Sequence, residues 1–93
     1  MKAIWNGKTI AESKNTIFLE GNQYFPPESI KKQYFIASEF QTVCAWKGTA
    51  SYYNLIVDGE MKQNAGWYYP EPSEKAKEIK NHVAFDDGVI ITK

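Results

Sequence analysis

The stretch CAWKGTASYY, residues 44 to 53, holds a cysteine three residues before a lysine and a glycine. Cys44 is the only cysteine, and two interpretations are open for it. Most free cysteines are small buried hydrophobic side chains. An exposed thiol near a positive charge is instead a nucleophile or redox group, because the charge lowers its pKa. On a regular strand Lys47 would point away from Cys44, so this second interpretation requires a bend between residues 45 and 48.

Lys47 is the second candidate for chemistry. A lysine before a glycine in a turn is usually solvated, but here Trp46, Tyr52 and Tyr53 lie close in sequence. These aromatic neighbours would exclude water from the amine and lower its pKa, which prepares it for acid/base work or anion binding. Gly48 would let a ligand or another part of the backbone approach closely.

Further polar side chains could complete a site around Lys47. Glu12 is a candidate general base or carboxylate partner for Lys47, and the alternative is a solvated glutamate at a strand end. Tyr24 and Tyr69 could offer hydroxyl groups to a ligand, although core packing is the more common use of a tyrosine. The predicted ligand-binding set is Glu12, Tyr24, Trp46, Lys47, Gly48 and Tyr69, and the candidate catalytic residues are Cys44, Lys47 and Glu12.

The composition argues against several classes of site. One cysteine and one histidine, His82, fall short of a tetrahedral zinc site, so we expect no metal, no cofactor and no disulfide within the monomer. The eleven basic residues are all lysine, and eleven acidic residues balance them. The chain therefore lacks the basic surface that nucleic-acid binding requires and the arginine side chains that favour phosphate recognition.

Short β-forming segments separated by turn residues must position these side chains. We expect about seven to nine short strands, one of which ends at the double proline of residues 26 and 27, because proline cannot donate to a sheet ladder. Asparagine or aspartate followed by glycine is the strongest signal of a two-residue hairpin turn. Such turns are predicted at Asn6-Gly7, Asp58-Gly59 and Asp87-Gly88.

One short helix is predicted near residues 73 to 80. Ser73 is a candidate N-cap, and Ala76 and Ile79 share one apolar face of an otherwise charged segment. Residues 28 to 32 could form a further helical turn. The sequence thus predicts a mainly β, antiparallel fold with a single domain over residues 1–93.

The chain shows no signal of export or membrane insertion. No stretch approaches the roughly 18 apolar residues that span a bilayer, and the N-terminus lacks the apolar core of a signal peptide. We expect a soluble cytoplasmic protein that does not bind membranes.

Five strings occur in a fixed order: AES at residues 11 to 13, GNQYFP at 21 to 26, CAWKGTASYY at 44 to 53, WYYPEP at 67 to 72 and HVAF at 82 to 85. In this order and spacing they resemble the small bacterial family known as domain of unknown function 427. The resemblance implies a compact β domain similar to the β-tent architecture. It also places Glu12, Cys44, Lys47 and Gly48 within the family's motifs.

Two properties associated with that resemblance do not carry over to this chain. Proteins of the β-tent architecture usually hold zinc with paired CxxC motifs, which a chain with one cysteine cannot supply. The family is sometimes labelled nucleotidyltransferase-like. The chain has neither the paired acidic metal ligands nor the phosphate-binding glycine loop of that chemistry.

Three functions remain open from the sequence. The first is a binding module whose aromatic pocket, rimmed by Glu12 and Lys47, holds a small polar or zwitterionic molecule or a peptide end. The second is a small enzyme that uses Cys44 or Lys47 as a nucleophile, or Glu12 and Lys47 as an acid/base pair. The third is a structural or protein-interaction domain without a pocket. The first is favoured, because a neutral chain without arginine or metal has few groups that stabilise a developing charge.

Overall fold

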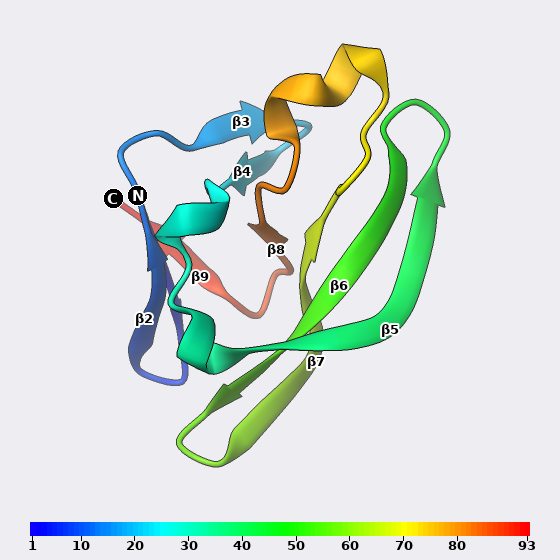
Figure 1. Cartoon of the computed structure of the whole chain (residues 1–93). Coiled ribbons are helices and arrows are strands. Elements are labelled where there is room, and N and C mark those ends of the chain that lie inside the picture. The colour runs from blue at the N-terminus through cyan, green and yellow to red at the C-terminus, as the bar shows by residue number, and fades with distance from the viewer.

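Nine strands and three 3₁₀ segments make up the chain in a computed structural model, which describes residues 1–93. The strands form three sheets, and neighbouring strands in each sheet run antiparallel (Figure 1). The prediction of a mainly β, antiparallel fold is therefore confirmed.

The N-terminal sheet has the strand order β2-β1-β9 and joins the two ends of the chain. β1 (Lys2–Trp5) and β2 (Lys8–Glu12) form a hairpin, and β9 (Ile90–Thr92) pairs with the other edge of β1. The turn residues Asn6 and Gly7 have φ angles of 49° and 76°, as a type I′ turn requires. The predicted first hairpin turn is confirmed.

A second hairpin joins β3 (Ile17–Leu19) to β4 (Asn22–Tyr24). Its turn consists of Glu20 and Gly21, whose φ angles are 51° and 83°. This hairpin packs against the 3₁₀ segment η3 (Glu74–Ile79) through shared buried side chains.

The largest sheet has the strand order β5-β6-β7-β8. β5 (Phe35–Cys44), β6 (Gly48–Val57) and β7 (Glu60–Tyr68) are long, whereas β8 (Ala84–Phe85) is short. The predicted turn at Asp58-Gly59 joins β6 to β7 with φ angles of 51° and 80°, so it is also confirmed.

The predicted hairpin turn at Asp87-Gly88 is wrong. The strands on its two sides belong to different sheets, because β8 pairs with β7 and β9 pairs with β1. The segment does turn locally, since the Asp86 carboxylate accepts a hydrogen bond from the Gly88 amide at 2.9 Å. Val89, which directly precedes β9, is buried in the main core, and this packing directs the chain to the N-terminal sheet. Turn residues indicated the change of direction, but long-range packing decides the strand partner.

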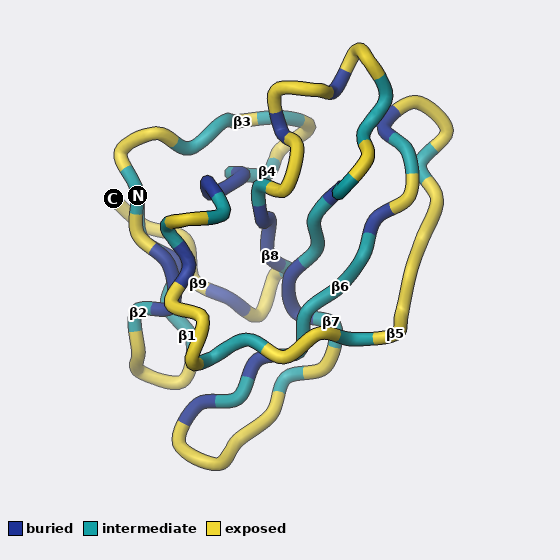
Figure 2. Tube along the Cα trace, viewed as in Figure 1, coloured by how far each residue is buried: buried dark blue, intermediate teal, exposed yellow.

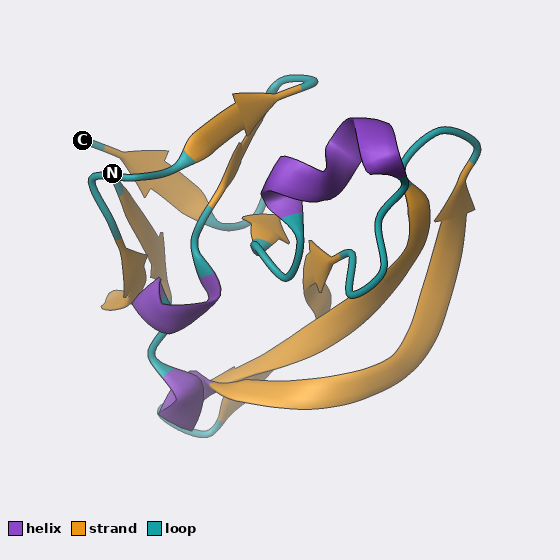
Figure 3. Cartoon of the chain, turned by 45° about the horizontal axis from the view of Figure 1, so that its top comes forward, coloured by secondary structure: helices purple, strands orange, loops and turns teal.

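The short helix predicted near residues 73 to 80 is not formed as an α-helix; the segment is η3, a 3₁₀ segment that is the longest of the helical segments in Figure 3. Ala76 and Ile79 are buried, as expected. Ser73 precedes the segment, but its hydroxyl does not cap it and instead donates to the carbonyl oxygen of Trp46. Ser73 therefore ties η3 to the turn between β5 and β6.

The helical turn expected over residues 28 to 32 is divided in two. η1 (Pro27–Ser29) and η2 (Lys32–Tyr34) flank Ile30, whose backbone pairs with Ala11 of β2. No helix of the chain is long and apolar enough to cross a membrane.

Buried side chains form two clusters, and Figure 2 shows where the chain is buried. The main core joins the N-terminal sheet to the largest sheet and consists of Ala3, Ile10, Ala11, Phe25, Ile30, Leu55, Val57, Ala65, Val83, Phe85 and Val89. The second core holds the β3–β4 hairpin and η3 against the largest sheet and consists of Tyr24, Ala50, Tyr69, Ala76, Ile79 and Ala84.

Candidate functional site

The turn between β5 and β6 brings the predicted reactive residues together. Cys44 ends β5 opposite Gly48, which begins β6, and residues 45 to 47 form the turn between them. The backbone therefore bends where a reactive Cys44 requires it to bend. Gly48 has a φ of 113°, and a Cβ there would lie 3.2 Å from the carbonyl oxygen of Glu71. The group that approaches Gly48 is thus the chain's own backbone.

Lys47 is buried, with 7% of its surface exposed, and its ammonium forms an ion pair with Glu20. The indole Nε1 of Trp46 donates to the other carboxylate oxygen of Glu20 at 3.2 Å. The Lys47 Nζ lies 5.3 Å from the centre of the Trp46 ring and 5.7 Å from the centre of the Tyr69 ring. We define the Lys47 corner as Glu20, Tyr24, Cys44, Trp46, Lys47 and Tyr69.

The pKa of Lys47 lies above its ordinary value, so the predicted lowering of this pKa is wrong. Burial acts to lower it, but the hydrogen bond to Glu20 and the nearby Tyr24 and Tyr69 phenol groups outweigh burial. Hydrogen bonds from Lys47 and Trp46 in turn lower the pKa of the Glu20 carboxyl. Lys47 is therefore an ammonium at neutral pH, which cannot act as a nucleophile.

Cys44 is a free thiol and is half-buried in the Lys47 corner. The backbone N–H groups of Lys47 and Trp46 lower its pKa; burial opposes them, and the Lys47 ammonium adds a smaller lowering. The direction agrees with the nucleophile interpretation. The backbone amides of the turn lower the pKa of Cys44 more than the Lys47 charge does, although the sequence had indicated only the charge.

Glu12 is not part of the Lys47 corner, so the predicted pair of Glu12 with Lys47 is wrong. Glu12 is exposed at the end of β2, opposite Lys2 of β1. The hairpin register fixes it in the N-terminal sheet, whereas Lys47 belongs to the largest sheet. Glu20 is the carboxylate partner instead. Nothing in the sequence marks Glu20, because the packing of the second core brings its turn to Lys47.

Tyr24 and Tyr69 are buried in the second core, next to Lys47. The Tyr24 hydroxyl accepts a hydrogen bond from Trp67 Nε1 at 3.3 Å. Burial is the largest effect on Tyr69; the Lys47 ammonium opposes it, and Tyr24 and Cys44 reinforce it, which together raise the pKa of Tyr69 to about 12. The Tyr69 hydroxyl therefore keeps its proton at neutral pH and can donate it in a hydrogen bond.

The aromatic pocket predicted around Glu12 and Lys47 is not present. Two cavities occur, and neither is lined by Glu12 or by a residue of the Lys47 corner. The smaller one, of about 230 Å³, is lined by Gln41, Thr49, Ser51, Pro70 and Glu71. No group of three or more His, Cys, Asp or Glu side chains is placed to hold a metal ion.

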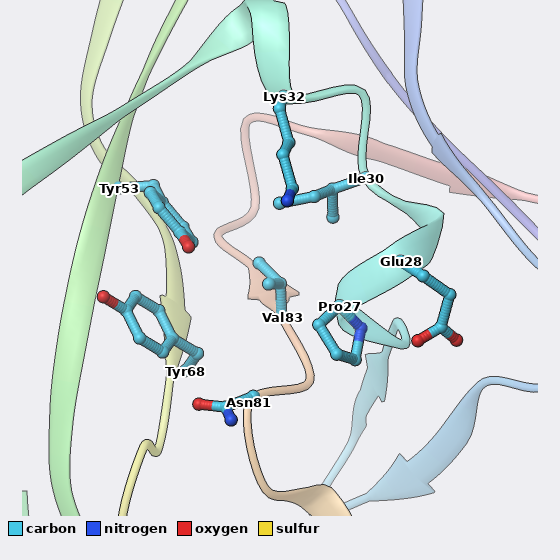
Figure 4. Close-up of a pocket in the computed structure, with 8 residues that line it drawn as sticks. All are labelled: Pro27, Glu28, Ile30, Lys32, Tyr53, Tyr68, Asn81 and Val83. Carbon is cyan, nitrogen blue, oxygen red and sulfur yellow. The ribbon is translucent and has the colours of Figure 1, made fainter.

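The larger cavity has a volume of about 400 Å³ and lies against β6 and β7 (Figure 4). We call it the Tyr53–Tyr68 cleft. Its lining comes from β6, β7, the segment from η1 to the start of η2, and the segment before β8. The lining residues are Pro27, Glu28, Ile30, Lys32, Tyr53, Tyr68, Asn81 and Val83.

One wall of the cleft is a stacked pair of tyrosines. The ring centres of Tyr53 and Tyr68 lie 4.7 Å apart, and the ring planes meet at 24°. Burial and the neighbouring Tyr68 raise the pKa of Tyr53, so its phenol is uncharged at neutral pH. Side chains alternate along a strand, and so Tyr52 and Trp67 pack with each other on the opposite face, with ring centres 6.3 Å apart.

The opposite wall combines apolar and polar side chains. Pro27, Ile30 and Val83 provide apolar surface. Lys32 is exposed and makes no ion pair within the chain, and Figure 4 shows its side chain directed toward the cleft. The side-chain amide of Asn81 lies at the rim near Tyr68 in the same view. The cleft therefore offers aromatic and aliphatic contacts together with two charged residues that make no ion pair, Lys32 and Glu28.

Sequence reasoning missed this cleft. It placed Tyr53 beside Lys47, together with Tyr52, whereas Tyr53 faces the cleft. The alternation of side chains along TASYYNLIV was a usable signal, because two adjacent strand residues cannot face the same way. Lys32 and Asn81 carry no such signal, since both come from connections whose position depends on the whole fold.

Comparison with protein families supports the resemblance seen in the ordered strings. A family model described as domain of unknown function (DUF427) matches residues 1–91. A search of curated proteins finds no match.

Proposed function

The chain belongs to the DUF427 family, and we propose that it is a binding domain whose Tyr53–Tyr68 cleft holds a small polar molecule. The observation that carries the proposal is a cavity of about 400 Å³ that combines a stacked tyrosine pair with an unpaired lysine. The proposed location is cytoplasmic, as expected from the sequence.

The size of the cleft supports this proposal. Small-molecule sites generally have volumes of about 300 to 1,000 Å³ and combine mostly apolar walls with a few polar groups. The Tyr53–Tyr68 cleft falls in that range, whereas the cavity of about 230 Å³ falls below it and has no hydrophobic lining residue.

The lining supports one class of ligand. The tyrosine pair and Pro27 offer flat surfaces that suit a ring or another planar group. Lys32 can bind a carboxylate, and Asn81 can donate or accept a hydrogen bond. The proposed ligand is therefore a small molecule with a planar or apolar part and a carboxylate, such as an aromatic amino acid or a peptide end.

The enzyme alternative has less support. Lys47 is protonated and paired with Glu20, and Glu12 lies in another sheet, so these side chains cannot form an acid/base pair. Cys44 keeps the features of a nucleophile, but neither cavity is lined by it.

The proposal is tested by thermal unfolding with a panel of aromatic and aliphatic amino acids, dipeptides and benzoate. A ligand at one hundred times its Kd stabilises the fold by about 2.7 kcal/mol, which raises the Tm of a domain of this size by on the order of 10 °C. Lys32→Met should abolish the rise in Tm caused by a carboxylate-bearing compound.

Lys31→Met is the matched control, because Lys31 is the adjacent exposed lysine and does not line the cleft. This variant should keep the full rise in Tm. The proposal fails if no compound in the panel raises the Tm, or if both lysine variants respond to the compound equally.

A further inference from the structure

The two cavities of the chain adjoin each other on one face of the largest sheet. Tyr53 and Tyr68 line the larger cavity, and Ser51 lines the smaller one. Ser51 of β6 lies directly opposite Tyr68 of β7, and residues opposite each other in an antiparallel pair share a face of the sheet. Tyr53 follows Ser51 by two residues along β6, so it shares that face as well. The two cavities therefore meet at the Ser51–Tyr68 pair.

We propose that the two cavities form one extended site, and that its ligand is a short peptide with a free amino end and a free carboxyl end. This inference rests on the proposed binding function, because the carboxyl end would lie in the Tyr53–Tyr68 cleft. It adds the smaller cavity, which we call the Glu71 cavity, as the place for the amino end. The Glu71 cavity is lined by Gln41, Thr49, Ser51, Pro70 and Glu71.

Two charged side chains without ion pairs lie at opposite ends of this face. Lys32 comes shortly before Phe35, where β5 begins opposite Leu55 of β6. Glu71 lies at the other end of β6, because its carbonyl oxygen would be 3.2 Å from a Cβ on Gly48. Both side chains belong to exposed residues, and neither makes an ion pair. A ligand on this face therefore meets a cation at one end and an anion at the other.

The segment that carries Glu71 is held against the sheet. The Ser73 amide donates to the carbonyl oxygen of Lys47 at 2.9 Å, and the Ser73 hydroxyl donates to that of Trp46. Both hydrogen bonds tie residues 71 to 73 to the turn between β5 and β6. Glu71 therefore keeps its place beside the first residues of β6, although its side chain is exposed.

The lining of the Glu71 cavity suits a peptide backbone. Each peptide residue other than proline carries one N–H donor and one C=O acceptor. The hydroxyl groups of Thr49 and Ser51 can donate or accept a hydrogen bond, and so can the side-chain amide of Gln41. Glu71 adds a carboxylate, which forms a charge-assisted hydrogen bond with a terminal ammonium. No lining residue is hydrophobic, so this cavity favours the backbone and the amino end of a peptide over an apolar group.

The spacing along β6 indicates the length of the ligand. A strand rises about 3.3 Å per residue, so Thr49 in the Glu71 cavity and Tyr53 in the cleft lie roughly 13 Å apart. An extended peptide advances by about 3.3 to 3.6 Å per residue. A peptide of about three or four residues therefore reaches both cavities, whereas a single amino acid occupies only one of them.

Glu28 is the other acidic residue that lines the cleft. Figure 4 shows Pro27 between Glu28 and the tyrosine pair, with the Glu28 carboxylate directed away from both tyrosine rings. Glu71 instead lines a cavity on the face of the sheet that the tyrosines share. The amino end of a peptide that lies along the tyrosine pair therefore reaches Glu71 and not Glu28.

The test compares the tripeptide Gly-Gly-Phe with its N-acetylated form and with phenylalanine, by isothermal titration calorimetry. The unaltered chain should bind Gly-Gly-Phe more tightly than phenylalanine, because only the tripeptide reaches both cavities. It should also bind Gly-Gly-Phe about fivefold more tightly than the acetylated form, since acetylation removes the charge that pairs with an exposed carboxylate.

Glu71→Gln should remove the preference for the free amino end, so that both tripeptides bind with the same Kd. Glu78→Gln is the matched control, because Glu78 is an exposed glutamate without an ion pair and lines neither cavity. This variant should keep the fivefold preference.

Three results would overturn the extended site. One is a tripeptide that binds the unaltered chain no more tightly than phenylalanine, and this result does not depend on the folding of any variant. Another is a preference for the free amino end that survives Glu71→Gln. The third is a preference that Glu28→Gln removes and Glu71→Gln does not, which would place the ammonium inside the cleft.

The same titrations separate this inference from the proposed function. If one of these three results is found while Lys32→Met still weakens the binding of phenylalanine, the cleft binds ligands without the Glu71 cavity. If Lys32→Met changes the binding of no compound, both the proposed function and the extended site are wrong.

Discussion

Lys47 is the one buried charged side chain, and its partner Glu20 explains how the fold tolerates it. A buried charge is costly unless it is paired and hydrogen-bonded. The carboxylate of Glu20 meets both the ammonium of Lys47 and the indole of Trp46. The Lys47 corner, which includes Cys44, therefore has a structural role, because it pairs a buried ammonium with a carboxylate.

Double-mutant cycles by chemical denaturation test this assignment. Lys47→Met and Glu20→Gln should be non-additive in the free energy of unfolding, because the two side chains are in contact. Lys47→Met and Glu12→Gln should be additive to within about 0.3 to 0.5 kcal/mol, since they do not meet. Additivity in the first cycle, or coupling in the second, would contradict the structure.

The coupling of Lys47 with Glu20 should also depend on pH. The folded-state pKa of Glu20 is lowered, so its contribution to stability is present above the ordinary glutamate pKa. It is lost as pH falls through the lowered value, where the carboxyl takes up a proton. The cycle measured in that acidic range should therefore show less coupling than the same cycle at neutral pH.

The turn between β5 and β6 tolerates substitution least, because both its backbone conformation and the space around it are restricted. Gly48 combines a positive φ with a close approach of the Glu71 carbonyl oxygen. Gly7 also has a positive φ, but a side chain there would meet open space. An alanine at position 7 would therefore introduce backbone strain alone, whereas an alanine at position 48 would introduce backbone strain and a steric conflict.

Gly48→Ala should destabilise the chain more than Gly7→Ala does. Strained backbone positions cost about 1 to 3 kcal/mol, and only Gly48→Ala adds a displacement of residues 71 to 73. Urea denaturation of both variants provides the comparison. An equal loss at the two positions would mean that the contact between the turn and the Glu71 backbone is not tight.

The residue types along the chain predicted the positions of strands and turns more accurately than they predicted which strands pair with each other. Asn6-Gly7 and Asp58-Gly59 were predictable, because a type I′ turn depends on two adjacent residues. Asp87-Gly88 misled, because β9 pairs with β1 from the other end of the chain. The sequence indicated that Cys44 and Lys47 can lie close together only if the chain bends between residues 45 and 48. It did not indicate Glu20 as the partner of Lys47, because that contact depends on how two hairpins pack.

At the scale of the molecule, the sheets leave one cleft of ligand size between the largest sheet and the segments around η1 and β8 (Figure 4). No single string of the sequence contains this cleft, since its residues come from four separate stretches of the chain. The sequence predicted that aromatic rings would line a pocket around Glu12 and Lys47. The fold determines that these rings are Tyr53 and Tyr68 and not the residues near Lys47.

Ligand binding in the Tyr53–Tyr68 cleft can be located by an NMR titration of the isotope-labelled chain with the carboxylate compound that most raises its Tm. Binding in the Tyr53–Tyr68 cleft should concentrate the amide shifts at residues 27 to 32, at Tyr53 and Tyr68, and at residues 81 to 83, and Lys32→Met should weaken them. Shifts that concentrate instead at residues 20 to 24 and 44 to 48 would contradict it, because they would place binding at the Lys47 corner.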